Sequence, residues 1–244
     1  TSADLAYYTK GKQLPTLIKS NIYTSLISVL FPGMSKINDE GEKVKALSRK
    51  SIRVLTYIIY PLMTGLLVVA EPLTVFLYTE KWIAMVPFVW VVCIEAIFSV
   101  PGTITLQSVK AMGYSDKMLK AEIFKKPILI LSIIIAMQYG VMAIALTLPL
   151  NTLLEFVING VMAHKTVDYS IREQLWDCLP ATIMSVLMGA GVLLVAHLPL
   201  GLGTIALLFV EILVGIVIYV LLSVITRNEE FMALASMAKQ YLKR

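Results

Sequence analysis

The chain alternates between long apolar stretches and short polar segments over residues 15–226. The apolar stretches lack the strict alternation of barrel strands, so the pattern predicts helices. A bilayer core requires about 20 apolar residues in a helix. We therefore predict an all-α polytopic membrane protein with seven transmembrane helices. The expected spans are Pro15–Met34, Val54–Tyr78, Ile83–Val109, Ala121–Gln138, Val141–Ala163, Cys178–Leu198 and Ile205–Thr226.

The polar segments divide the chain into five expected parts. Lys125 and Lys126 lie near the start of the short fourth span, which therefore needs snorkelling side chains or support from its neighbours. The seventh span is almost entirely Leu, Val and Ile, which favours a position outside the main bundle. The expected parts are an external loop at 1–14, a five-helix part of a transport lobe at 15–163, a cytoplasmic loop at 164–177, a peripheral helix pair at 178–226 and a cytoplasmic interfacial tail at 227–244.

Composition and charge support a membrane protein. Hydrophobic residues make up 58% of the 244 residues and charged residues 15%, whereas a soluble domain has about 25% charged residues. The net charge of +5 does not indicate a nucleic-acid partner, because the basic residues lie at helix ends. By the positive-inside rule, their distribution predicts a multi-pass protein with a cytoplasmic C-terminus. The only Lys and Arg on the opposite side would be Lys10, Lys12, Lys19 and Lys81.

Polar residues recur at helical spacing within three of the expected spans, at every fourth position in two of them. Such residues share a helix face, and polar side chains inside a membrane normally face protein or water. Three polar faces favour a hydrated cavity, although hydrogen bonds that only join neighbouring helices remain an alternative. The three sets are Glu95, Ser99, Thr103 and Gln107; Thr147, Asn151, Glu155 and Asn159; and Asn21, Thr24, Ser25 and Ser28 below Lys19.

Two carboxylates fall within these polar faces. Burying a charged carboxylate in a membrane is costly unless it pairs with a cation or takes up a proton. Glu95 and Glu155 are therefore candidate ion-coupling residues.

Enzyme motifs are absent from the sequence. There is no phosphate-binding GxxxxGK[ST] loop, no HExxH and no Cys–His cluster with metal-ligand spacing. His164 and His197 are the only histidines, and both lie at span edges. We therefore expect a transporter without a cofactor or metal site, rather than an enzyme.

Several segments together resemble Wzx-type polysaccharide and lipopolysaccharide flippases, the oligosaccharide flippase branch of the MOP superfamily. The resemblance covers essentially the whole chain. The segments are Tyr7-Tyr8-Thr9-Lys10-Gly11-Lys12-Gln13, Ser28-Val29-Leu30-Phe31-Pro32-Gly33-Met34-Ser35-Lys36, Ala70-Glu71-Pro72-Leu73, Glu80-Lys81-Trp82, Lys110-Ala111-Met112-Gly113-Tyr114-Ser115-Asp116, Glu122-Ile123-Phe124-Lys125-Lys126-Pro127, Gly215-Ile216-Val217-Ile218-Tyr219 and Glu230-Phe231.

The resemblance implies a fold, a substrate and partners. The chain begins at Thr1 with a polar segment, which we interpret as part of a longer protein. It would be the C-terminal helical lobe of a MATE-like transporter, whose partners are membrane lipids and an N-terminal lobe of the same protein. The expected activity is alternating-access flipping of an undecaprenyl-pyrophosphate-linked oligosaccharide across the bacterial inner membrane, driven by a proton or sodium gradient.

The resemblance also implies roles for residues. Lys19 would contact the pyrophosphate, with Lys110 at the cytoplasmic mouth of the cavity. Gln107, Asn151 and Asn159 would contact sugar hydroxyls. The full substrate cavity would comprise Lys19, Asn21, Ser25, Ser28, Ser99, Thr103, Gln107, Lys110, Thr147, Asn151 and Asn159.

Two other functions remain open. A cation-coupled drug exporter of the same superfamily would need a small aromatic pocket, whereas these faces are rich in hydroxyl and amide groups. An integral-membrane glycosyl transferase would need an acidic metal-binding loop at a membrane face, which the sequence does not supply.

Overall fold

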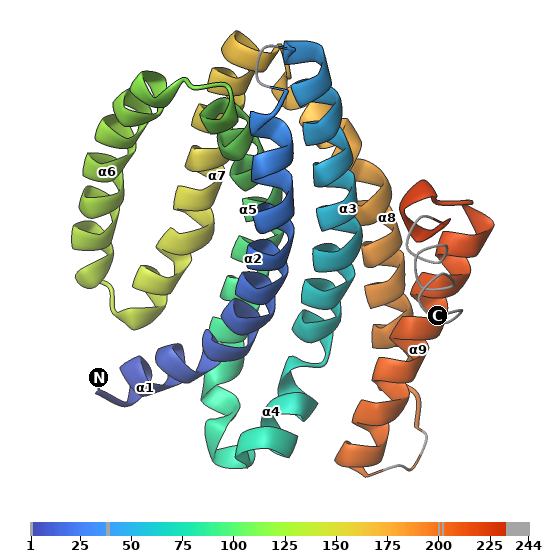
Figure 1. Cartoon of the computed structure of the whole chain (residues 1–244). Helices are drawn as coiled ribbons and strands as arrows, with labels where there is room; N and C mark the ends of the chain where they lie inside the picture. Colours follow the sequence, from blue (N-terminus) through green and yellow to red (C-terminus); the bar gives the residue numbers. More distant parts are fainter. Residues whose placement is uncertain (1, 38–39, 200, 202, 233–244) are drawn as a thin grey trace.

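A computed structural model describes residues 2–37, 40–199, 201 and 203–232 of the chain, and within that part the regular structure is entirely helical. Long helices run side by side, with α6 at one edge and α9 at the other (Figure 1). The elements are α1 (Ser2–Gly11), α2 (Gln13–Ser35), α3 (Gly41–Val68), α4 (Ala70–Tyr78), the 3₁₀ helix η1 (Glu80–Met85), α5 (Val86–Ala111), α6 (Ser115–Met137), α7 (Val141–Val167), α8 (Ile171–Ala196) and α9 (Thr204–Ile225).

Six helical stretches in the described residues are long and apolar enough to cross a membrane, where the sequence predicted seven spans. The expected fourth span, Ala121–Gln138, lies in α6 and is not among the six. Its 23-residue helix includes a charged first half, so too little apolar length remains. The six stretches are Ser2–Ser35, Gly41–Val68, Glu80–Ala111, Val141–Val167, Ile171–Ala196 and Thr204–Ile225.

The second expected span is divided in two. Helix α3 ends at Val68 and α4 begins at Ala70, so residues 54–78 do not form one continuous helix. Pro72 lies three residues after Val69 and has no N–H to donate to Val68, which explains the break. The chain then turns through Thr79, whose φ of 79° lies in the left-handed region, and enters η1.

Two segments expected to be loops are largely helical. Residues 1–14 contain α1, which leads almost directly into α2. Residues 164–177 contain the end of α7 and the start of α8, with only residues 168–170 between the two helices. Helix α8 begins early because Ser170 caps it: the Ser170 hydroxyl accepts from the Glu173 backbone N–H, and Glu173 accepts from the Ser170 backbone N–H.

Helix α8 is not peripheral, contrary to the expected pairing of 178–226 outside the bundle. It packs against α3 on one side and α9 on the other (Figure 1). Small residues permit this packing, since a Cβ added to Gly189 would lie 2.8 Å from Thr64 Cγ2 on α3. Helix α9 lies at the edge of the bundle (Figure 1). Most of the expected tail, residues 233–244, lies outside the described residues.

The largest apolar core lies between α2, α3 and α5. It includes the fully buried Met34, Ile52, Met63 and Ile104, and Tyr169 closes it near the start of α8. Within this core the hydroxyls of Ser48 and Ser108 join α3 to α5 at 2.6 Å. This packing fixes the relative positions of α2 and α5, which form two of the walls of the polar cavity described below.

Helices α5 and α7 approach closely at Gly102. A Cβ at Gly102 would lie 3.3 Å from Phe156 Cα. We expect Gly102→Val to force the helices apart and to destabilise the protein by about 1–3 kcal/mol, measured as a lower melting temperature in detergent. Gly33→Val is the matched control, because its nearest neighbour is the flexible end of Leu47 at 3.8 Å. Equal melting temperatures for the two variants would contradict the proposed close approach.

Candidate functional site

A polar cavity of about 310 Å³ lies between α2, α5 and α7. These helices occupy the middle of the bundle in Figure 1. Each of the three helices also belongs to a stretch that is apolar enough to cross a membrane, so this polar cavity lies among potential membrane spans. Its lining residues are Lys19, Tyr23, Ile27, Glu95, Ser99, Gly102, Thr103, Leu106, Thr152, Glu155 and Asn159.

An ion pair joins two walls of the cavity. The Lys19 ammonium on α2 contacts both carboxylate oxygens of Glu95 on α5, at 2.8 and 2.7 Å. The two side chains are 22% and 15% exposed. Thr152 on α7 donates to Glu95 Oε1 at 3.4 Å. Lys19, which the resemblance assigns to pyrophosphate, is therefore paired with a carboxylate, and Glu95 is bound from two sides.

A second carboxylate lines the same cavity. Glu155 on α7 is exposed, and no hydrogen bond or ion pair of its side chain is present among the described residues. Because Lys19 and Glu95 balance each other, Glu155 leaves the lining with a net negative formal charge. Such a lining is suited to a cation or to neutral hydroxyl groups, and it opposes a bound anion unless the ion pair opens.

Hydroxyl and amide groups complete the lining. The Tyr23 and Ser99 hydroxyls lie 3.0 Å apart, joining α2 to α5. Asn159, which is 3% exposed, donates to the Gly102 carbonyl at 3.2 Å. Its side-chain oxygen accepts from Lys125 on α6 at 3.5 Å. Lys125 is itself buried and forms an ion pair with Glu122 at 2.5 Å. A cation from the helix at the edge of the bundle thus reaches one residue of the cavity lining.

The structure brings six of the thirteen predicted site residues together in the cavity. The six are Lys19, Glu95, Ser99, Thr103, Glu155 and Asn159. The remaining seven do not line it: Asn21, Ser25, Ser28, Gln107, Lys110, Thr147 and Asn151.

The polar residues of α2 divide between two faces. Lys19 and Tyr23 face the cavity, whereas Asn21 and Ser25 line a separate hollow of about 380 Å³ against α3. Ser28 is exposed and donates to the Ser25 carbonyl at 2.9 Å. Successive residues turn about 100° around a helix, so Asn21 lies on the side opposite Lys19. The polar set predicted from α2 is therefore two surfaces rather than one.

The predicted polar positions on α5 and α7 also do not all face the cavity, because of the geometry of the helix. A step of four residues overshoots one turn by about 40°, so four such positions cannot all face one cavity. On α7, Thr147 donates to the Ile144 carbonyl at 2.7 Å, and Asn151 donates to Ser132 on α6 at 3.1 Å. On α5, Gln107 falls beyond the lining and the Lys110 ammonium lies 5.1 Å from the Phe31 ring centre.

Three cavity contacts were not anticipated: Tyr23, Thr152 and Lys125. Tyr23 lies four residues after Lys19 and Thr152 lies three before Glu155, so helical spacing from the charged residues would have found both. The sequence places Lys125 only near the start of an expected span. Its burial follows from packing between α6 and α7, which has no signal in the sequence.

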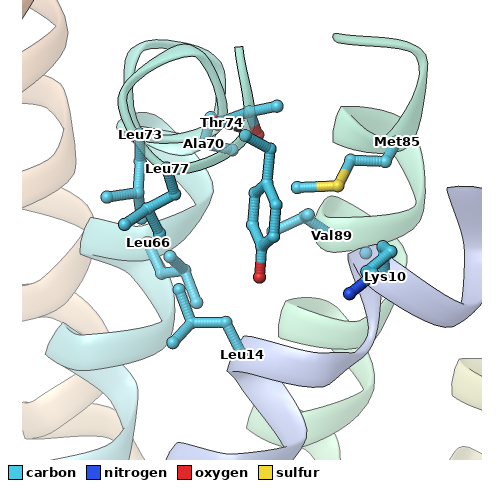
Figure 2. A pocket seen from close by; sticks show the side chains of 11 residues that line it. Lys10, Leu14, Leu66, Ala70, Leu73, Thr74, Leu77, Met85 and Val89 are labelled. Carbon is cyan, nitrogen blue, oxygen red and sulfur yellow. Dashed lines mark hydrogen bonds between the residues drawn. The ribbon is translucent and has the colours of Figure 1, made fainter. Parts of the chain in front are cut away.

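A smaller pocket near α1 is a weaker candidate (Figure 2). Its volume is about 20 Å³ and most of its lining is aliphatic. The Lys10 ammonium lies 5.8 Å from the centre of the Tyr78 ring, which places the cation beside the ring rather than in an open binding site. We interpret this pocket as a packing gap where α1 and α2 meet α4 and η1.

Comparisons with known proteins agree with the resemblance found in the sequence. Residues 1–87 match a family model described as "Polysaccharide biosynthesis protein". The lipopolysaccharide biosynthesis protein WzxC of Escherichia coli K12 is 29% identical over 136 residues, which cover 56% of this chain and 27% of WzxC. An uncharacterised membrane protein in the cps region of Klebsiella pneumoniae is 35% identical over 75 residues, covering 31% of this chain and 16% of that protein.

These matches confirm the resemblance to Wzx-type polysaccharide flippases. The chain spans less than a third of the length of either curated relative. The structure of the lipid II flippase MurJ, in an inward closed conformation, superimposes with a TM-score of 0.74 and 17% identity over 92% of this chain and 48% of MurJ. This neighbour shows that the chain has the same fold as about half of MurJ.

Proposed function

We propose that this chain forms one lobe of a Wzx-type flippase that moves an undecaprenyl-pyrophosphate-linked oligosaccharide across the bacterial inner membrane. The observation that carries the proposal is the polar cavity, with its Lys19–Glu95 pair, among helices apolar enough to span a bilayer. The matches to a polysaccharide biosynthesis family and to WzxC support this substrate class. A second lobe, corresponding to the rest of these relatives, would complete the alternating-access transporter.

The proposed orientation places the C-terminus in the cytoplasm. It is supported by the concentration of Lys and Arg in alternate connections between helices.

The cavity chemistry suggests how the roles divide. Its negative formal charge suits a coupling cation, and we assign Glu95 and Glu155 to proton or sodium coupling. The Ser99, Thr103 and Asn159 side chains supply polar groups for sugar hydroxyls. Lys19 would release Glu95 and bind pyrophosphate during the cycle. The exchange is needed because a single ammonium group cannot neutralise the Glu95 carboxylate and the pyrophosphate at the same time.

Complementation tests the proposed function. The protein, together with any other lobe of its natural chain, is expressed in a bacterium whose own polysaccharide flippase has been deleted. Restored surface polymer is the expected result. The same strain is tested against cationic drugs, since drug resistance without restored polymer would favour the exporter. Formation of a glycosylated lipid from a sugar donor by the purified protein would favour the transferase.

Glu155→Gln is expected to reduce polymer export at least about tenfold while leaving membrane expression intact. The substitution removes the ionisable group but keeps the size and a hydrogen-bonding side chain, so it tests ion coupling rather than packing. Glu71→Gln is the control, because Glu71 is exposed on α4 and does not line the cavity. Equal polymer levels in the two variants, at equal expression, would remove Glu155 from the coupling mechanism.

A further inference from the structure

A second charged pocket lies at the start of α3, away from the polar cavity. Its volume is about 430 Å³. We call it the charged pocket. Its lining residues are Ala46, Arg49, Lys50, Arg53, Val54, Glu229 and Glu230. One wall therefore carries three cations from α3, and the other carries two carboxylates from the segment after α9.

The arginines of the charged pocket are held in place by a buried carboxylate. Arg49 Nε and Nη2 donate to Asp177 at 2.8 and 3.1 Å, and Arg53 Nε donates to it at 2.9 Å. The Asp177 side chain is 1% exposed, whereas those of Arg49 and Arg53 are 37% and 41% exposed. One carboxylate thus orients two guanidinium groups and neutralises only one of their charges. Each guanidinium has five N–H donors, so both retain donors beyond those that contact Asp177.

Tyr169 is a third hydrogen-bond donor to Asp177, beside the two arginines. Its hydroxyl donates to Asp177 Oδ2 at 2.8 Å. Burial, followed by this hydrogen bond, raises the pKa of the Tyr169 phenol above its usual value, which keeps the phenol a donor. Asp177 and Tyr169 therefore orient the two guanidinium groups before any ligand binds.

The acidic wall is also fixed. The Asn228 side chain accepts from the backbone N–H of Phe231 at 3.0 Å, which orders the turn that carries both glutamates. Phe231 packs against the apolar cluster formed around Tyr57 and Tyr219. Glu229 and Glu230 line the same pocket as the cations of α3, and no ion pair joins the two walls among the described residues.

We propose that the charged pocket binds the headgroup of phosphatidylethanolamine. The phosphate would contact Arg49, Lys50 and Arg53, since guanidinium groups bind phosphate oxygens with directed hydrogen bonds. The primary ammonium would contact Glu229 and Glu230. A headgroup with one negative and one positive charge is complementary to both walls at once.

The position of the pocket along the helices favours a lipid as the source of this headgroup. The apolar helix α9 ends at Ile225, a few residues before Glu229. On α3, the apolar segment expected to enter the membrane begins at Val54, immediately after Arg53. The pocket therefore lies at the boundary between apolar and charged sequence, where phospholipid phosphates are found.

The acidic wall argues against a purely anionic lipid. Phosphatidylglycerol has the same phosphate but no ammonium, so Glu229 and Glu230 would gain no partner from it. Each carboxylate near a bound anion weakens binding through repulsion. The charged pocket is therefore expected to select phosphatidylethanolamine over phosphatidylglycerol.

Native mass spectrometry of the protein in detergent tests this proposal. The protein is titrated separately with phosphatidylethanolamine and phosphatidylglycerol that have the same acyl chains. The expected result is tighter binding of phosphatidylethanolamine by about fivefold, a preference that Glu229→Gln combined with Glu230→Gln abolishes. Glu229→Lys combined with Glu230→Lys should reverse the preference, because the pocket then has cations on both walls. Lys50→Gln should weaken both lipids about fivefold.

The control is Lys120→Gln, which removes an exposed lysine from α6 outside the charged pocket. Its lipid binding should match that of the unaltered protein. Equal affinities of the unaltered protein for the two lipids, or an unchanged preference in the Glu229→Lys and Glu230→Lys variant, would overturn the proposal. Neither substituted wall contacts the polar cavity, so failure here leaves the proposed transport function standing.

Discussion

Glu95→Gln is expected to reduce polysaccharide export at least about tenfold, which corresponds to about 1.4 kcal/mol in the transport cycle. The substitution removes the carboxylate that binds the Lys19 ammonium at 2.7 and 2.8 Å. An amide cannot neutralise the ammonium, so Lys19 loses its counter-charge within the apolar bundle. The measurement is surface polymer in the flippase-deleted strain, normalised to the amount of protein in the membrane.

A charge swap separates a structural role of this pair from a functional one. Lys19→Glu combined with Glu95→Lys keeps an ion pair between α2 and α5, so the melting temperature of this variant should be closer to that of the unaltered protein than the melting temperature of Glu95→Gln is. Export should remain low, because the cation then lies on α5 and the carboxylate on α2, which changes the relation of both to Glu155. Normal export by the swapped protein would show that the pair only joins the helices.

Asp177→Asn is expected to lower the stability of the protein by about 3 kcal/mol. Asp177 accepts hydrogen bonds from Arg49, Arg53 and Tyr169, and its side chain is 1% exposed. Removing one partner of a buried ion pair costs about 3–5 kcal/mol. We expect the lower end of this range, because water reaches both arginines and compensates part of the loss. The measurement is thermal unfolding of the purified protein in detergent.

Asp116→Asn provides the matched control for Asp177→Asn. Asp116 is an exposed carboxylate in the first turn of α6, so its loss should change stability by less than about 0.5 kcal/mol. If the two variants unfold at the same temperature, Asp177 does not hold the start of α8 against α3.

The sequence was sufficient to predict the helices, their approximate spans and the three helices that line the cavity, α2, α5 and α7. Long apolar stretches have few alternatives in a bilayer, because every backbone group must be paired within the protein. The ends of helices were predicted less well where a proline or a capping residue determines them. Pro72 ends α3 early, and the cap formed by Ser170 and Glu173 starts α8 seven residues before Cys178.

The composition of the site was predicted only in part. Polar residues at helical spacing, with a mid-span carboxylate in two of the three sets, identified the helices that line the cavity, since such residues need a partner or water. Spacing of four residues was too coarse to identify every lining side chain, because the polar face rotates along the helix. Long-range packing decided the rest: Lys19 pairs with Glu95 across 76 residues of sequence, and Lys125 reaches Asn159 from α6.

Helix α2 separates the polar cavity from the hollow against α3, and it has polar residues on both sides. Lys19 and Tyr23 line the polar cavity, while Asn21 and Ser25 line the hollow on the other side of the helix. Because α2 forms a wall of both the polar cavity and the hollow against α3, a rotation of this helix about its axis would change the shape of both. A ligand that rotated α2 from one side would therefore alter the shape of the hollow on the other side through this helix alone.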